Sequence, residues 1–272
     1  MGITKSTGLK AQKEAQPSSR NRAPVIWPWI LVTAAWTVVL LAVLTKQTSL
    51  INHTYLLTQS HLSWIAALLV FLASWQVMTI AMMVPSSMPL VYMIVLASRH
   101  QQYSWIIQGA FLAGYAVVWT TFALVAFLAD TLVHGLVRNW FWLYLHSWLI
   151  SATVFAIAGA FQFSSLKKHC LKQCRNPQSF FTYYYQKGVV ASWHLGLRHG
   201  MFCLGCCWAL MLVMFGVGVG SIVWMAVLTG IMVIEKTYPG GQRLRLLFGI
   251  VLLLLSALWL VHSAWLLAGS GV

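Results

Sequence analysis

The sequence predicts an all-α protein, a polytopic bundle of transmembrane helices, from three observations. Of the 272 residues, 60% are hydrophobic and 7% are charged, whereas soluble domains contain about 45–50% apolar and about 25% charged residues. The mean hydropathy is +0.78. Runs such as Ile250–Leu255 are apolar at every position, which excludes the alternation of a transmembrane β-barrel. The composition also excludes an ordinary soluble enzyme, a disordered chain and a secreted disulfide scaffold.

About seven segments approach the roughly 20 apolar residues that a helix needs to cross the hydrocarbon. We expect the spans at Val25–Leu44, within Leu68–Ala97, and at Trp105–Leu128, Trp148–Leu166, Met201–Val219, Ser221–Glu235 and Leu246–Leu267. The sixth is short and follows the fifth after a glycine-rich joint, so these two are expected to form a hairpin. Residues 25–268 are then one transmembrane domain, preceded by a disordered basic tail at residues 1–24.

The basic residues predict the orientation of the chain. With the N-terminus in the cytoplasm, Lys46 and Arg138 are the only two of the 17 Lys and Arg residues on the outer side. This bias predicts a cytoplasmic N-terminus and an outer C-terminus. The net charge of +14 therefore indicates anchoring of loops at the lipid bilayer of a bacterial inner (plasma) membrane, not binding of nucleic acid.

All five cysteines lie in a cytoplasmic segment, residues 167–207, where stable disulfides are rare. Several of them are one helical turn apart and would share a helix face. Histidines lie beside them in the sequence, so we predict a metal site with the ligands Cys170, Cys174, Cys203, Cys206, Cys207, His169 and His199. The alternative is ordinary burial, because free cysteine packs as a small apolar side chain.

Thiolate and thioether ligands favour copper as Cu(I), with zinc as the alternative. Methionines and prolines in the second span could extend such a site into a pathway, because Pro85 and Pro89 are expected to interrupt the helix there. The residues proposed for the pathway are Met78, Met82, Met83, Pro85, Ser86, Met88 and Glu235. The alternatives to a metal pathway are that the prolines only kink a packed helix and that the methionines only fill helix interfaces.

Three stretches resemble a bacterial family of predicted metal-binding integral membrane proteins, domain of unknown function 2182. They are Ala81–Ser86, Cys170–Pro177 and Gly196–Met211, the last containing Arg-His-Gly and Cys-Leu-Gly-Cys-Cys-Trp. Glu235-Lys236, followed by Pro239, resembles the segment after that family's sixth helix. The resemblance covers roughly Leu68 to Leu260 and implies a multi-pass protein that binds metal through these Cys and His residues.

Three functions stay open on the sequence alone. The first is handling of a soft metal for transfer, transport or assembly, together with a metal-donor or metal-acceptor protein. The second is a membrane thiol–disulfide protein that uses Cys203 and Cys206 at a helix N-terminus. The third is a structural or assembly subunit of a membrane complex. No Walker loop or hydrolase motif is present, so the sequence favours a protein that is not an enzyme.

Overall fold

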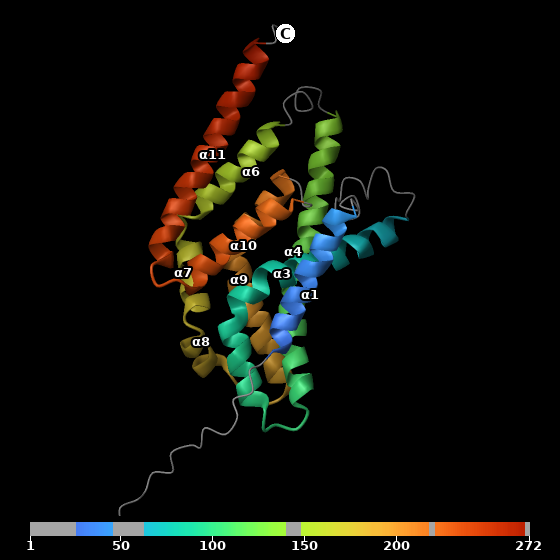
Figure 1. Cartoon of the computed structure of the whole chain (residues 1–272), viewed down its shortest axis with the longest axis vertical. Helices are drawn as coiled ribbons and strands as arrows, with labels where there is room; N and C mark the ends of the chain where they lie inside the picture. The colour runs from blue at the N-terminus through green and yellow to red at the C-terminus, as the bar shows by residue number, and fades with distance from the viewer. Residues whose placement is uncertain (1–25, 46–62, 140–147, 218–220, 270–272) are drawn as a thin grey trace, which may run out of the picture.

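The computed structural model describes residues 26–45, 63–139, 148–217 and 221–269, so the predicted tail at residues 1–24 lies outside the described part (Figure 1). Within these ranges all regular structure is helical, as the composition predicts. The helices are α1 (Trp27–Leu44), α3 (Trp64–Ser98), α4 (Ser104–Asn139), α6 (Trp148–Phe161), α7 (Ser165–Arg175), α8 (Pro177–Tyr184), α9 (Val189–Val217), α10 (Ile222–Thr237) and α11 (Gly241–Gly269).

In the described residues, five helices are long and apolar enough to cross a membrane: α1, α3, α4, α9 and α11. Counting the bent pair α6 and α7 as one span gives six. The predicted sixth span is the 16-residue α10, which at about 1.5 Å per residue is shorter than the roughly 30 Å hydrocarbon layer. The count of seven and the orientation of the termini therefore stay predictions, although a helix lies within each predicted segment where the structure describes it.

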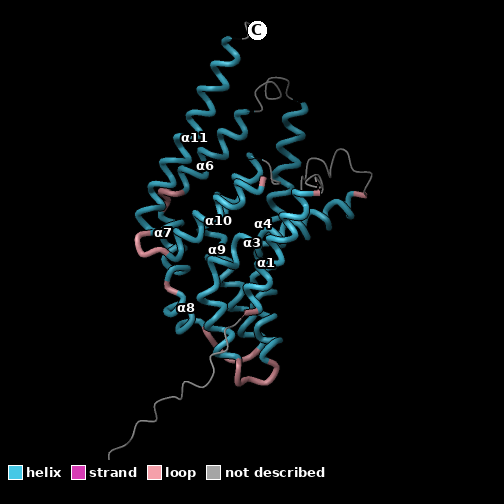
Figure 2. The backbone as a smooth tube through the Cα atoms, in the orientation of Figure 1, coloured by secondary structure: helices cyan, strands magenta, loops and turns pink. Residues whose placement is uncertain are grey.

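The predicted fourth span is wrong at its C-terminal end. Helix α6 ends at Phe161 instead of continuing to Leu166, and α7 turns away from it by 65° (Figure 2). The cause is the serine between them, because the side chain of Ser164 accepts a hydrogen bond from the Lys167 amide and caps a new helix. The cysteines at 170 and 174 thus lie on a separate short helix.

Helix α3 runs without a break through Pro85 and Pro89, so the predicted interruption is wrong. Figure 1 shows instead a change of direction between the two halves of α3. Pro85 leaves the Ala81 carbonyl without its helical donor, and the indole nitrogen of Trp36 on α1 donates to that carbonyl at 3.1 Å. A donor from a neighbouring helix thus satisfies the freed group.

Helix α9 lies at the centre of the fold and packs against α4, α6, α7 and α10. Its contact with α4 depends on glycine at Gly114 and Gly196. A Cβ at Gly196 would overlap the Phe111 carbonyl oxygen, and one at Gly114 would overlap the Trp193 carbonyl oxygen. Small residues of this kind let the backbones of membrane helices approach closely. The predicted fifth span began at Met201, whereas α9 begins twelve residues earlier, at Val189.

Candidate metal site

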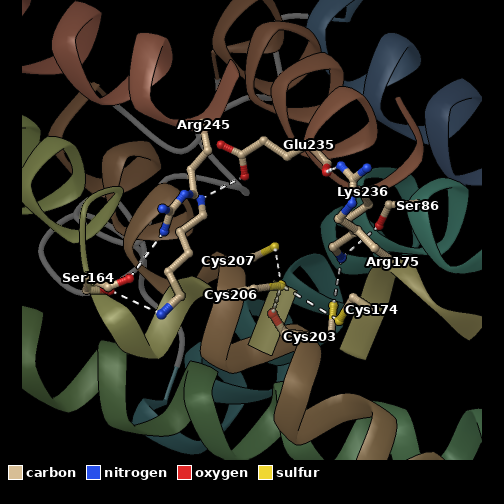
Figure 3. Close-up of polar contacts among 11 residues, drawn as sticks. Ser86, Ser164, Cys174, Arg175, Cys203, Cys206, Cys207, Glu235, Lys236 and Arg245 are labelled. Carbon is tan, nitrogen blue, oxygen red and sulfur yellow. Dashed lines mark hydrogen bonds and ion pairs between the residues drawn. The ribbon is translucent and has the colours of Figure 1, made fainter. Parts of the chain in front are cut away.

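Helices α7 and α9 lie side by side and carry all five cysteines, which are free thiols. Cys170 and Cys174 are one turn apart on α7 and face α9. The Cys170 sulfur packs over Gly205, where an added Cβ would lie 2.6 Å from it. On α9 the side chains of Cys203, Cys206 and Cys207 are all buried, so the two helices enclose sulfur atoms between them (Figure 3).

Three sulfur atoms lie within 4 Å of a neighbouring sulfur. Cys174 Sγ is 3.9 Å from Cys206 Sγ, and Cys206 Sγ is 3.3 Å from Cys207 Sγ. We call Cys174, Cys206 and Cys207 the thiol cluster. Cys174 is partly exposed, whereas Cys206 and Cys207 are buried. The cluster therefore joins an accessible thiol to two thiols in the interior, and the predicted approach of the two segments is observed for Cys174.

The fourth thiol in this region, Cys203, contacts a buried lysine. Lys236 Nζ donates to Cys203 Sγ at 3.1 Å and to the Ser86 hydroxyl at 2.9 Å. The Tyr115 hydroxyl lies 3.1 Å from the same sulfur. Lys236 is only 5% exposed and Cys203 is fully buried. An ammonium group in such a place needs a compensating partner, and the sulfur atoms are the nearest candidates to carry negative charge.

The position of α7 is fixed by Glu235, the residue before Lys236. Its carboxylate forms a buried ion pair with Lys167, with Nζ and Oε2 2.7 Å apart and both side chains at most 1% exposed. Its backbone carbonyl accepts a hydrogen bond from Arg175 at 2.7 Å. Both ends of α7 are thus tied to α10 (Figure 3). Glu235, which the sequence placed in a pathway, acts here as a positioning residue for the helix that carries Cys174.

The two predicted histidine ligands lie apart from the thiol cluster. His199 is buried, its Nε2 is 3.1 Å from the Ser87 hydroxyl, and its ring stacks on Tyr115. His169 is exposed and lies beside Phe202. Among the residues that the structure describes, no group of three or more His, Cys, Asp or Glu side chains is already arranged to hold a metal ion. The full Cys/His cluster expected from the sequence is therefore not shown.

The residues proposed for a pathway are mostly buried on α3. Those with side chains at most 6% exposed are Met78, Met82, Met83, Ser86 and Met88. Ser86 touches Lys236 and also donates to the Met83 carbonyl at 2.8 Å. Met78, Met82 and Met83 belong to the same buried cluster as the cysteines, whereas Met88 belongs to a separate one, so a pathway stays a prediction.

Sequence reasoning missed Lys236 and Tyr115 as neighbours of the cysteines. Lys236 was named only as a cytoplasmic charge and in the family resemblance, although its position at the end of an apolar segment was a signal that it could be buried. The placing of Cys203 and Cys206 at a helix N-terminus is wrong. Helix α9 begins 14 residues before Cys203, so its unpaired amides and helix dipole are too far away to activate these thiols.

Fold and site together define a protein of membrane-spanning helices with a thiol cluster and a lysine buried between them. The family model of PpoB2, described as a copper chaperone, matches residues 72–259, which is more than half of the chain. The chain therefore belongs to this copper-related family, and the family suggested by the sequence motifs is not confirmed by name. Comparison with curated proteins and with solved structures gave no match.

Proposed function

We propose that this protein is a membrane copper chaperone that binds Cu(I) through the thiol cluster and passes it to another protein. The observation that carries the proposal is the 3.9 Å approach of Cys174 on α7 to Cys206 on α9. Soft thiolates select Cu(I), and ligands commonly draw together only when the metal binds. Membership of a family described as copper chaperones supports the same metal.

The difference in exposure within the thiol cluster supports a transfer role. Cys174 is partly exposed and makes the cluster accessible from the protein surface, whereas Cys206 and Cys207 are buried. A donor or acceptor protein would exchange Cu(I) with Cys174 first, and the buried thiols would then complete the coordination. Each exchange forms one Cu–S bond and breaks another, with copper remaining Cu(I) throughout.

The number of thiols favours Cu(I) over zinc. A structural Zn²⁺ site has four ligands in tetrahedral geometry, whereas the thiol cluster supplies three sulfur atoms and His199 is bonded to Ser87 instead. Lys236, which contacts the neighbouring Cys203, would offset part of the negative charge of a copper–thiolate complex.

The test is Cu(I) binding by the purified full chain in mild detergent with reductant present. We expect tight binding in competition with a Cu(I) chelator, and its loss in Cys174→Ser and in Cys206→Ser. The matched control is Cys170→Ser, on the same helix as Cys174 but packed over Gly205, and it should bind as the parent does. If Cys206→Ser retains the affinity of the parent, the thiol cluster is not the copper site.

The thiol–disulfide alternative now has less support, because Cys203 and Cys206 are both fully buried within α9. A redox partner would have to reach them through packed helices. A count of free thiols in protein purified without reductant separates the two functions, since a redox protein would lose two thiols reversibly.

A further inference from the structure

The buried face of α9 continues from cysteine into methionine. Cys203, Cys207, Met211 and Met214 follow one another at intervals of four, four and three residues, which places them on one face of the helix. Each is at most 1% exposed. At about 1.5 Å per residue these four side chains cover about 16 Å along the helix axis. Sulfur is therefore present at every turn over 12 of the 29 residues of this helix.

Methionines of two neighbouring helices join this row. Met78 and Met82 on α3, and Met225 and Met232 on α10, belong to the same contiguous cluster of buried side chains as Cys206, Cys207, Met211 and Met214. Two contacts mark the ends of this stretch. At one end Lys236 contacts both Cys203 and Ser86. At the other end Trp75 of α3 packs on Phe215 of α9, with ring centroids 5.5 Å apart.

Ordinary helix packing accounts poorly for this composition. Interfaces of membrane helices are enriched in small residues, and α9 follows that rule in its first half, where Gly196 and Gly200 meet α4. In its second half the same helix presents long thioethers inward instead. Of the ten methionines that the structure describes, seven lie in the cluster that contains the cysteines.

We propose that these methionines form a thioether path that carries Cu(I) from the thiol cluster through the interior of the helix bundle. The residues of the path are Met78, Met82, Met211, Met214, Met225 and Met232. Thioethers are soft ligands that suit Cu(I). They are neutral, so each holds the ion less strongly than a thiolate. A row of weak sites is what conduction requires, because an ion must be able both to enter and to leave.

The transfer needs no oxidant and no reductant. Copper stays Cu(I), and at each step one Cu–S bond forms while another breaks. When the ion moves from Cys207 to Met211, the thiolates left behind take up protons from solvent, which reaches the site at the partly exposed Cys174. The proposal rests on Cu(I) binding at the thiol cluster and adds a route away from it.

The test uses the full chain reconstituted in phosphatidylcholine vesicles that enclose a membrane-impermeant Cu(I) chelator. Cu(I) is supplied outside as its glutathione complex, and the absorbance of the enclosed chelator reports its arrival. The variant is Met211→Leu with Met214→Leu, which removes two thioethers at nearly constant volume. The matched control is Met201→Leu, on the same helix but 61% exposed.

We expect the parent and Met201→Leu to admit Cu(I), and the double variant to fall to the rate of protein-free vesicles. Cu(I) binding in detergent should be the same in all three. A double variant that admits Cu(I) as fast as the parent would overturn the path, and so would a parent no faster than protein-free vesicles. Absence of Cu(I) binding by the parent in detergent would instead refute the proposed function. If the double variant does not insert, Met214→Leu alone is judged by the same criteria.

Discussion

Lys236 Nζ lies 3.1 Å from Cys203 Sγ, and both side chains are buried between α3, α9 and α10. A buried ammonium group in contact with a thiol is a costly arrangement unless a negative charge balances it. The structure therefore places an amino group beside Cys203, next in the helix to the proposed Cu(I) ligands Cys206 and Cys207. If copper binds there as proposed, this group would balance part of the negative charge of the copper–thiolate complex.

The first prediction is that Lys236→Met weakens Cu(I) binding by about tenfold or more, equivalent to ~1.4 kcal/mol. The methionine keeps the length of the side chain but removes the charge that balances the complex. Competition with a Cu(I) chelator measures the effect. Lys172→Met is the control, because Lys172 is an exposed lysine on α7, and it should leave the affinity unchanged. Equal affinities of parent and Lys236→Met would show that the charge has no part in binding.

The second prediction concerns the ion pair between Lys167 and Glu235. Glu235→Gln leaves Lys167 buried without its partner and should lower the free energy of unfolding by about 3–5 kcal/mol. Because this pair also holds α7 in place, the affinity for Cu(I) should fall as well. Unfolding by denaturing detergent in mixed micelles, followed by circular dichroism, measures the stability.

The control for this pair is the double variant Lys167→Met with Glu235→Leu. Replacing both buried charges with apolar groups is often neutral or stabilising, so most of the lost stability and Cu(I) affinity should return. A double variant as unstable as Glu235→Gln alone would mean that the loss of stability comes from altered packing and not from an unpaired charge.

The third prediction tests the satisfied proline kink in α3. Trp36→Phe removes the donor to the Ala81 carbonyl, so the stability should fall by about 1 kcal/mol. The amides of residues 82–87 should exchange with deuterium faster, because that turn has lost its external support. Trp29→Phe provides the comparison, since Trp29 lies on the same helix and is 47% exposed. Unchanged exchange in Trp36→Phe would mean that the kink needs no donor from α1.

Hydropathy predicted the positions of the long apolar helices, because lipid requires such segments wherever the chain crosses, but not the short helices α7 and α8. The approach of Cys174 to Cys206 was predicted too, but from a hairpin whose second helix begins at Met201. Cys206 lies 17 residues into α9, and the contact arises because α7 packs along the side of α9. The start of α9 could not be predicted, because Arg198 and His199 are polar and interrupt the apolar run. His199 is nevertheless buried inside the bundle, where aromatic rings and Ser87 surround it.

The contact of Lys236 with Cys203 was beyond prediction for a different reason. It depends on the rotation of α10 about its axis and on where α10 crosses α9, and packing decides both. The same holds for Glu235, whose sequence neighbours gave no sign of a partner 68 positions away at Lys167. The bend between α6 and α7 was not predicted, because the apolar residues around Ser164 suggested a continuous helix. Ser164 was not identified as a helix cap.

The fourth prediction addresses the orientation of the chain, which the distribution of Lys and Arg places with the N-terminus in the cytoplasm. Alkaline phosphatase fused after Val272 should be active, because this enzyme works only outside the cytoplasm. The same reporter placed after Lys187, in the link between α8 and α9, should be inactive. The reverse pattern would put the partly exposed Cys174 on the outer side and require an outer copper donor.

The last prediction tests the close contact between α4 and α9. Gly196→Ala would force a methyl group into the Phe111 carbonyl, so the two backbones must separate, with an expected loss of stability of about 1–3 kcal/mol. Since α9 carries Cys203, Cys206 and Cys207, the Cu(I) affinity should fall as well. The matched control is Gly109→Ala on α4, where nothing lies within 4 Å of an added Cβ. There the methyl group should raise the stability by about 0.4–1 kcal/mol, because alanine restricts the unfolded chain. If Gly196→Ala and Gly109→Ala lower the stability equally, the loss does not come from the tight contact between α4 and α9. That contact would then not fix the position of the thiols.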